Sequence, residues 1–403
     1  MPSEFARHWT LDPAIAFLNH GSYGAAPRPV LAAQLAWRDR MEAEPVLFFS
    51  HDLEPALDAA RAVLGSFVGA DPDDLAFVPN ATAGTNTVLR SLRFEPGDEL
   101  LTTDHAYNAA KNAIEYVAER HGARTVIAAV PFPISSPTIV CEAVLAAVTP
   151  RTRLAVLDHI TSATGLIFPI EELVAELTAR GVETLVDGAH AAGQVPLHVP
   201  SVGATYYTAN LHKWVCAPKG SGFLWVRRDR QAAIRPLAIS HGANSPRSDR
   251  SRYRVEFDWT GTADPSAYLA VPDAIAFGES LLPGGWEALR ERNHALVLAG
   301  RDRLCTALGI EPPAPDPMIA SMASVPLPVE PGAGRVQGIE LYDDVVHDQL
   351  IRLGMQVMVT PWPQRPNGGA WRRLVRISAA AYNDLAQFER LAAALAGIAG
   401  MAV

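Results

Sequence analysis

The strongest constraint on the fold is a regular alternation of short apolar runs and helical patterns in the first half of the chain. Between residues 57 and 208, runs of the strand type are followed by segments whose apolar residues recur at helical spacing. Strands and helices that alternate in this way favour a mainly parallel sheet with helices on both faces, and therefore an α/β fold. We expect strands at 75–78, 99–103, 125–130, 154–157, 184–186 and 205–208, and helices at 57–68, 108–120, 141–148 and 171–180.

The alternation stops at residues 240–258, a polar segment that contains four arginines. We interpret this segment as a solvated loop, with a lid over a binding site as the alternative. The rest of the chain predicts a smaller α+β unit after a long helical stretch. We expect helices at 267–278, 286–307, 343–353 and 385–398, and strands near 319–325, 335–341, 356–360 and 374–378.

Charge and cysteine content exclude several classes of protein. Lys and Arg number 34 against 43 Asp and Glu, so the net charge of −9 gives no basic surface for nucleic acid or an anionic membrane. The three cysteines are widely spaced and form no CxxC pair, which indicates neither a disulfide framework nor a metal site. No run of about eighteen apolar residues occurs. We therefore expect a soluble cytoplasmic protein without a metal.

Open α/β sheets bind ligands beyond the carboxyl ends of their strands, so the residues that follow each strand are the candidates for a site. After the strand at 75–78, small residues around Ala81 and Thr82 begin a helix whose free N–H groups favour an anion; an ordinary helix cap is the alternative. After the strand at 99–103, Tyr107 offers a ring that can stack on a planar cofactor or pack in the core.

Two further strand ends carry polar groups. Thr161 and Ser162 follow the fourth strand and can donate to a phenolate oxygen or merely to loop backbone. Asp187 ends a buried strand, where an unpaired charge is costly and a protonated pyridine nitrogen would be a suitable partner. The alternative there is a helix-capping aspartate beside a core histidine, His190.

The stretch 205–225 places a lysine at the end of a strand. Asn210 and His212 precede Lys213, and Pro218 and Gly220 break the chain soon after it. A lysine held in this way can act as an amine nucleophile toward an aldehyde cofactor. Because a phosphate-type turn, an aromatic ring and an acid occupy earlier strand ends of the same sheet, we predict that Lys213 carries pyridoxal 5'-phosphate.

Four motifs carry a resemblance to a known family: Asn19-His20-Gly21-Ser22-Tyr23-Gly24, Asn80-Ala81-Thr82, Asp187-Gly188-Ala189-His190 and Asn210-Leu211-His212-Lys213-Trp214. The likeness extends through Arg376 and so covers nearly the whole chain. The sequence resembles the class V aminotransferase superfamily of fold type I pyridoxal phosphate enzymes, in its isopenicillin N epimerase-like branch, which is related to cysteine desulfurases and cysteine-conjugate C–S lyases. It implies an N-terminal segment near the active site (1–28), a large cofactor-binding domain with a mainly parallel, seven-stranded type of sheet (29–265), and linking helices with a small α+β domain (266–403).

The resemblance also implies roles around the cofactor. Lys213 would bind it covalently and then act as the base at the substrate Cα, Asp187 would pair with the pyridine nitrogen, and His190 would lie beside the phenolic oxygen. Tyr107 would cover the ring face. The phosphate would be held by Ala81, Thr82, Asn210 and His212.

Substrate and partner residues are implied in the same way. Arg376 resembles the arginine that binds the substrate α-carboxylate, where a planar fork is favoured over lysine; taken alone, it would be a solvated strand residue. Asn19 and His20 would contribute to the substrate site. Thr262 resembles a residue that reaches the partner's phosphate, which implies a homodimer with shared active sites.

The reaction is less constrained than the cofactor. A cysteine desulfurase needs a nucleophilic cysteine before the carboxylate-binding arginine, and residues 354–363 contain none. We favour a C–S β-lyase of an S-conjugated L-cysteine in thiol or antibiotic biosynthesis, because it requires one base at Cα. An epimerase would need a second acid/base, for which Tyr107 and His20 are the candidates. A decarboxylation-coupled oxidative deaminase and an aminotransferase are further alternatives, while the acidic balance disfavours a cofactor-binding regulator of nucleic acid.

Overall fold

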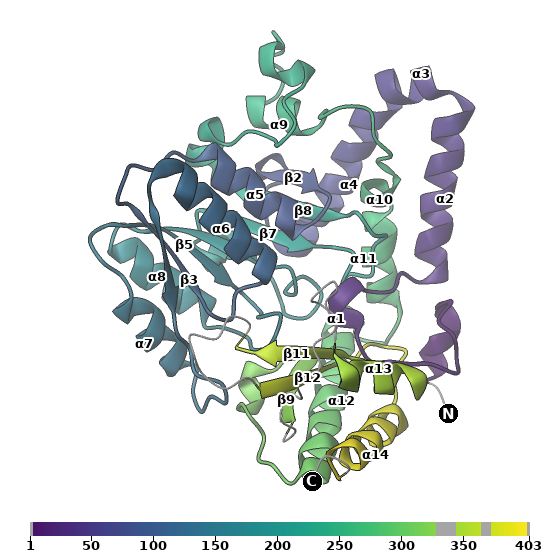
Figure 1. The fold of residues 1–403 in the computed structure, drawn as a ribbon. Helices are drawn as coiled ribbons and strands as arrows, with labels where there is room; N and C mark the ends of the chain where they lie inside the picture. The colour runs from purple at the N-terminus through teal and green to yellow at the C-terminus, as the bar shows by residue number, and fades with distance from the viewer. Residues whose placement is uncertain (1–2, 328–343, 364–371, 401–403) are drawn as a thin grey trace.

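A seven-stranded sheet forms the centre of the molecule (Figure 1). The computed structural model describes residues 3–327, 344–363 and 372–400. The strand order is β2-β8-β7-β6-β5-β3-β4, and β8 runs antiparallel to both of its neighbours while the other pairs are parallel. The expected α/β fold is confirmed. The strands are β2 (Leu75–Val78), β3 (Glu99–Thr103), β4 (Arg124–Ala128), β5 (Thr152–Asp158), β6 (Glu183–Asp187), β7 (Tyr206–Asn210) and β8 (Gly222–Val226).

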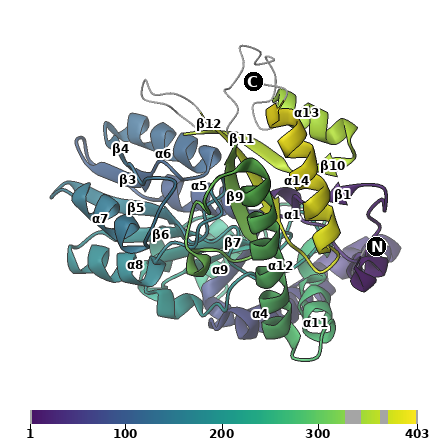
Figure 2. The ribbon, with the colours of Figure 1, turned by 90° about the horizontal axis from the view of Figure 1, so that it is seen from below.

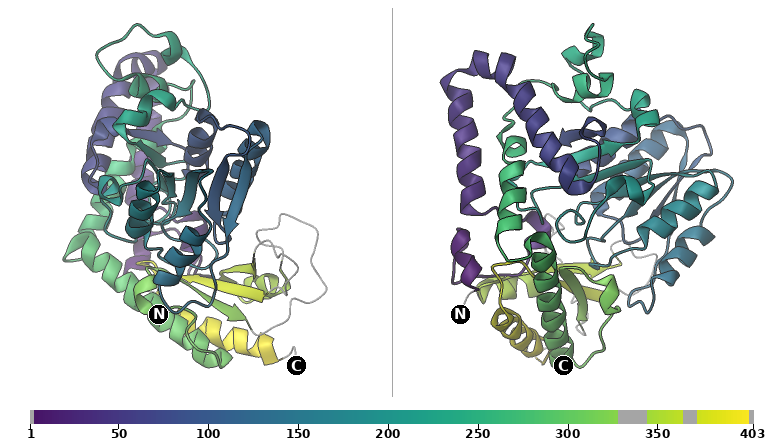
Figure 3. Two further views of the ribbon diagram at one scale, coloured as in Figure 1. Left: turned by 90° about the vertical axis from the view of Figure 1, so that its left-hand side faces the viewer. Right: turned by 180° about the vertical axis from the view of Figure 1, so that it is seen from behind.

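Helices cover both faces of this sheet (Figures 1 and 3). Strand β2 shows why: Ala76 and Val78 pack toward α5 and α6, while Leu75 and Phe77 pack into the core on the opposite face. Successive side chains of a strand point to opposite faces, so a strand that is apolar throughout is buried on both. The covering helices are α4 (Leu53–Val68), α5 (Ala81–Ser91), α6 (Asn108–His121), α7 (Thr138–Ala146) and α8 (Ile170–Ala179).

A second, three-stranded antiparallel sheet lies below the first, with the order β11-β12-β9. Helix α12 packs against it, and α14 packs side by side with α12 (Figure 2). This sheet and the elements around it form a second, smaller unit. The unit consists of α12 (Gly285–Leu308), β9 (Met322–Leu327), α13 (Val345–Arg352), β10 (Met355–Gln356), β11 (Met358–Trp362), β12 (Arg372–Ser378) and α14 (Leu385–Gly400). The strand expected at 335–341 lies outside the described residues.

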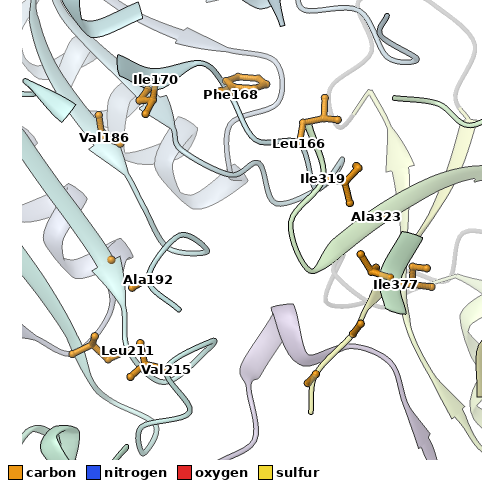
Figure 4. Packing of buried hydrophobic residues seen from close by; sticks show 14 of the residues in the cluster. Leu166, Phe168, Ile170, Val186, Ala192, Leu211, Val215, Ile319, Ala323 and Ile377 are labelled. Atoms are coloured by element: carbon orange, nitrogen blue, oxygen red, sulfur yellow. The ribbon is translucent and has the colours of Figure 1, made fainter. Parts of the chain in front are cut away.

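The N-terminal segment belongs structurally to this second unit as well as to the first. Its strand β1 (Ala16–Phe17) pairs in parallel with β10. Helices then run along the large unit: α1 (His20–Tyr23), α2 (Arg28–Ala43), α3 (Pro45–Leu47), and later α10 (Ser266–Leu269) and α11 (Val271–Ser280). The two units share one hydrophobic core, in which Leu166 from the large unit lies near Ile319, just before β9, and Ala323 in β9 (Figure 4).

The arginine-rich segment differs from its expected form. Residues 252–257 form helix α9 (Arg252–Phe257), and Arg254 is buried rather than solvated. Its guanidinium pairs with Asp58 of α4, with Asp73 and with Asp258. The solvated-loop interpretation is therefore wrong for this part, because four-residue spacing of arginine and acid stabilises a helix and α4 supplies further carboxylates.

Glu99 joins the beginnings of three neighbouring strands. Its buried carboxylate accepts hydrogen bonds from the Thr149 hydroxyl, from Arg151 at 3.0 Å and from Arg124 at 2.6 Å. These donors, Thr149 foremost, lower the pKa of Glu99 to about 2. Thr149 and Arg151 precede β5 and Arg124 begins β4, so one acid fixes the entry of the chain into β3, β4 and β5.

We expect Glu99→Gln to lower the free energy of unfolding at pH 7 by roughly 1–3 kcal/mol, because the amide replaces charge-assisted hydrogen bonds. The folded pKa lies below the ordinary value of 4.5, so this stabilisation is present above that pH and is lost as the pH falls toward about 2. Urea unfolding at several pH values should show the gap between variant and wild type narrowing below pH 4.5. The exposed Glu42→Gln is the control, and a gap that stays constant with pH would contradict this account.

Candidate active site

A cavity of about 280 Å³ lies at the carboxyl ends of the parallel strands. Strands that run in the same direction end at the same edge of a sheet, so side chains distant in the sequence meet there. The cavity brings together ten predicted residues: Ala81, Thr82, Tyr107, Ser162, Asp187, His190, Asn210, His212, Lys213 and Arg376. The first nine end or follow strands of the large sheet, and Arg376 comes from β12 of the small one.

Lys213 lies in the turn that follows β7, with its Nζ 3.1 Å from Nε2 of His190. Burial, and then the charge of Arg376, lower the pKa of Lys213 to about 7. The carboxylates of Asp187 and Asp158 oppose this shift. A substantial fraction of the amine is therefore unprotonated near neutral pH, which is the form that acts as a nucleophile or a base.

Two carboxyl groups lie side by side at the strand ends. Asp158 and Asp187 are paired in register between β5 and β6, and both are buried in the cavity wall. Burial raises the pKa of both carboxyl groups, and Asp187 raises that of Asp158 further. Asp187 accepts a hydrogen bond from the Ala189 N–H at 2.9 Å, which orients it. A cationic pyridine nitrogen at this place would compensate a buried charge, so the site fits the predicted cofactor.

Asp158 was missed by the sequence analysis as a cavity residue. The sequence predicts hydroxyl groups from its segment, although the carboxylate ends a strand adjacent to that of Asp187. The position of an acid at a buried strand end was the available signal. Tyr23 and Met358 also line the cavity without having been predicted, because only tertiary packing places them there.

His190 lies in the cavity wall beside Lys213. The ring is buried, and burial, followed by the charge of Lys213, lowers the pKa of His190 well below its ordinary value, so the ring is neutral. Its Nε2 is the nitrogen on the lysine side of the ring, while Nδ1 is fully buried and finds no hydrogen-bond partner among the described residues. The resemblance implies a phenolic oxygen beside this ring.

The sequence allows two interpretations of the beginning of α5, an ordinary helix cap and an anion site. Asn80 caps the helix by accepting from the Ala83 N–H at 2.8 Å. Asn210 accepts from the Ala81 N–H at 2.8 Å, which ties the helix to the end of β7. Thr82 lines the cavity beside these groups. The helix N-terminus therefore opens into the cavity, where its dipole favours a phosphate, although Ala81 already donates to Asn210.

Gly84 and His212 complete this corner. A Cβ atom on Gly84 would lie 2.1 Å from Oγ1 of Thr208, so the glycine allows α5 to approach β7 closely. Nδ1 of His212 lies 2.9 Å from the Ser221 carbonyl and must carry the proton that is donated to it. Burial lowers the pKa of His212 to about 4. A phosphate dianion would shift that pKa upward.

Arg376 is buried and donates hydrogen bonds to several oxygens. It donates to the Ser162 carbonyl at 2.7 Å, the Ser22 hydroxyl at 2.9 Å and Oδ1 of Asn19 at 3.1 Å. The alternative of a solvated strand residue is therefore wrong. Asn19 does not line the cavity, and it is connected to the site by the hydrogen bond that it accepts from Arg376. A guanidinium fixed at the cavity wall is suited to a carboxylate.

Tyr107 is the aromatic residue that lines the cavity near β3. The nearby His105 lies outside, where its Nδ1 contacts the Thr164 hydroxyl at 2.8 Å and its ring packs on Trp362. The position of Tyr107 is compatible with covering a planar ring, and this role stays a prediction.

Three further predicted residues lie outside the cavity wall. Thr161 is buried, and its hydroxyl bonds the Thr164 hydroxyl and the Leu166 N–H, so it shapes the turn as the alternative proposed. Both ring nitrogens of His20 are bonded away from the cavity, to Tyr382 and to the Lys213 carbonyl. Thr262 is exposed. Their proposed roles in cofactor or substrate binding stay predictions.

Within the described part of the chain, no cluster of three or more His, Cys, Asp or Glu side chains has a geometry suited to a metal ion. None of its helices combines the length and apolar character needed to span a membrane.

Comparison with known proteins places this geometry in a family. The aminotransferase class-V family model matches residues 25–341. The isopenicillin N epimerase of Amycolatopsis lactamdurans is 37% identical over 400 residues, covering 96% of each chain. The putative L-cysteine desulfhydrase 1 of Oryza sativa subsp. japonica is 34% identical, covering 96% of this chain and 83% of the relative. The hercynylcysteine sulfoxide lyase of Schizosaccharomyces pombe is 26% identical over 78% of this chain and 82% of its own.

Solved structures show the same fold at lower identity. A cysteine desulfurase from Thermococcus onnurineus superimposes with a TM-score of 0.79 at 19% identity, covering 100% of this chain and 99% of the other. A cystine C–S lyase gives 0.74 at 21% identity, covering 95% and 97%. The resemblance carried by the four sequence motifs is thereby confirmed. The chain belongs to the aminotransferase class-V family and is a pyridoxal-phosphate-dependent enzyme.

Proposed function

We propose that this enzyme is a C–S β-lyase that acts on an L-cysteine derivative with a substituent on sulfur. The observation that carries the proposal is a single basic amine, Lys213, placed in one cavity with the buried Asp187 and Arg376. β-Elimination requires removal of the Cα proton and departure of the sulfur from Cβ, so one base suffices. Several relatives bear the names of cysteine desulfhydrases or of a sulfoxide lyase, which supports the same class.

Four of the cavity residues have distinct roles in this proposal. Bound pyridoxal phosphate supplies an electron sink for negative charge at the substrate Cα. Lys213 accepts the Cα proton in its unprotonated form. Arg376 binds the α-carboxylate and so turns the Cα–H bond toward Lys213. Asp187 pairs with the pyridine nitrogen, and Tyr107 covers the ring face.

Persulfide chemistry is not part of the proposal. None of the three cysteines lines the cavity among the described residues. Cys216 is the nearest to Lys213 in sequence, and burial raises the pKa of its thiol to about 12. A thiol that stays protonated is a poor sulfur acceptor.

An epimerase is the second candidate, because the isopenicillin N epimerase relative aligns over nearly its full length. Inversion at Cα needs a proton donor on the face opposite Lys213. Tyr107 lines the cavity and is the candidate donor. His20 is not, because both of its ring nitrogens bond groups outside the cavity.

We also propose a homodimer, with Thr262 reaching the partner's cavity. A second hollow of about 290 Å³ lies beside Thr262 and is lined largely by apolar side chains, among them Phe49, Leu237 and Trp259. Leu237 is 51% exposed in the single chain. An apolar hollow beside exposed apolar residues is typical of a surface that another protein covers.

The reaction is tested with a panel of cysteine thioethers and L-amino acids, in which thiol, pyruvate, carbon dioxide and D-amino acid are measured together. We expect equal amounts of thiol and pyruvate from at least one thioether. Lys213→Ala should reduce turnover by on the order of 10³-fold or more, since it removes the base. D-amino acid without thiol would favour the epimerase, and absence of thiol and pyruvate with every thioether would contradict the lyase.

The role of Arg376 is tested by exchanging one cation for another. Arg376→Lys should raise KM by roughly 10–100-fold with a smaller effect on kcat, because the bidentate contact with the carboxylate is lost. Arg373→Lys is the matched control on the same strand, since Arg373 pairs with Asp344 and does not line the cavity. Equal changes in KM for the two variants would show that Arg376 has no special part in substrate binding.

The dimer is tested by measuring molecular mass in solution as a function of concentration. The wild-type chain should have twice the mass of 43.2 kDa. Leu237→Asp should shift the equilibrium toward the monomer, because it places a charge on the apolar surface. Ile127→Asp, which changes a comparably exposed apolar residue on the edge strand β4, should not. A wild-type monomer at all concentrations would refute the proposal.

A further inference from the structure

His20 links three parts of the chain that are distant in the sequence. Its ring is 1% exposed and is absent from the wall of the Lys213 cavity. Nε2 lies 2.8 Å from the main-chain carbonyl oxygen of Lys213, and Nδ1 lies 2.7 Å from the hydroxyl of Tyr382. The ring therefore spans from the turn that carries the lysine to the segment that follows β12.

The chemistry of the two partners fixes the direction of both hydrogen bonds. A carbonyl oxygen can only accept, so Nε2 carries the ring proton and donates it to Lys213. Nδ1 is then unprotonated and accepts from the Tyr382 hydroxyl. Burial lowers the pKa of His20 to about 4, so the ring stays neutral and keeps this tautomer at physiological pH.

Main-chain contacts on two sides hold the turn that carries Lys213. The Lys213 carbonyl also accepts from the Cys216 N–H at 2.9 Å, and Cys216 has a φ of +61°, a conformation that costs energy for a residue with a side chain. On the other side, a Cβ atom on Gly24 would lie 2.0 Å from the His212 carbonyl oxygen. The N-terminal segment thus packs directly on the main chain next to the reactive lysine.

The same N-terminal segment holds the substrate-binding arginine. Asn19 and Ser22 flank His20 and accept hydrogen bonds from Arg376. The Gly21 N–H donates to the Ser378 hydroxyl at 3.2 Å. One short segment therefore positions the side chain of Arg376 and the main chain of Lys213 relative to each other.

We propose that His20 is a positioning residue that holds the Lys213 main chain through its Nε2–H, with Tyr382 fixing the orientation of the ring. The proposal rests on Lys213 being the cofactor lysine. It assigns His20 neither proton transfer nor substrate contact. When the hydrogen bond from His20 Nε2 to the Lys213 carbonyl is absent, the turn loses a contact at the lysine itself, and the amine no longer has one fixed direction into the cavity.

The test compares variants that keep or remove single hydrogen bonds. In His20→Gln the side-chain amide retains a donor for the Lys213 carbonyl, whereas His20→Ala removes it and Tyr382→Phe removes only the hydroxyl. Tyr253→Phe is the matched control, since this buried tyrosine donates to the Leu224 carbonyl at 3.1 Å and neither residue lines the cavity. Three quantities are measured for each: the Kd of pyridoxal phosphate, the pH midpoint of its visible band on the protein, and the melting temperature.

We expect His20→Ala to weaken cofactor binding at least tenfold and to displace the pH midpoint of the band. His20→Gln should stay within about threefold of wild type, and Tyr382→Phe should lie between the two. Tyr253→Phe should lower the melting temperature without moving the band or the Kd. If His20→Ala fails to fold, the comparison of Tyr382→Phe with Tyr253→Phe decides the matter.

Two outcomes would overturn the proposal in distinguishable ways. If His20→Ala and Tyr382→Phe change only the melting temperature, as the control does, then His20 serves stability alone. If the wild-type chain itself shows no visible band with pyridoxal phosphate, Lys213 does not bind the cofactor. Both the proposed function and the positioning role of His20 are then wrong.

Discussion

The parallel direction of the central strands is the constraint on which the site depends. It brings the residues that follow β2, β3, β5, β6 and β7 to one edge, where the amine, the acids, the aromatic ring and the start of α5 surround a single cavity. Burial there raises the pKa of Asp187 and lowers that of Lys213. Burial at this edge of the sheet therefore leaves the negative charge of Asp187 without compensation until a cation binds beside it, and it favours the unprotonated amine of Lys213 that acts as a base.

The small unit contributes the arginine that we propose binds the substrate, and this arginine comes from outside the central sheet. Its strand β12 delivers Arg376 to the cavity, and the N-terminal segment fixes that guanidinium through Asn19 and Ser22. Because β1 pairs with β10 as well, the segment is attached to the small unit on one side and to the Lys213 turn on the other. Substrate recognition and the reactive amine are therefore held by one piece of chain.

Features encoded locally could be predicted from the sequence. Most strands of the large sheet, the helix that begins at Ala81, the acid at Asp187 and the lysine after β7 each follow from a short pattern, and the structure places those site residues together. Strand β8 was not among the predicted strands. Features set by tertiary contacts could not. The burial of Arg254 depends on carboxylates from α4, the turn around Thr161 depends on Thr164 and Leu166, and His20 acquires its partners from residues 213 and 382. Asp158 lies between these cases, since its strand end was visible but its pairing with Asp187 was not.

The central claim is that Lys213 is the residue to which the cofactor is attached. The most direct measurement is borohydride reduction of the protein with bound pyridoxal phosphate, followed by peptide mapping by mass spectrometry. The account predicts one modified peptide, with the pyridoxyl group on Lys213. Modification of another lysine such as Lys111 or Lys219, or no modification in a protein that retains the cofactor, would contradict it.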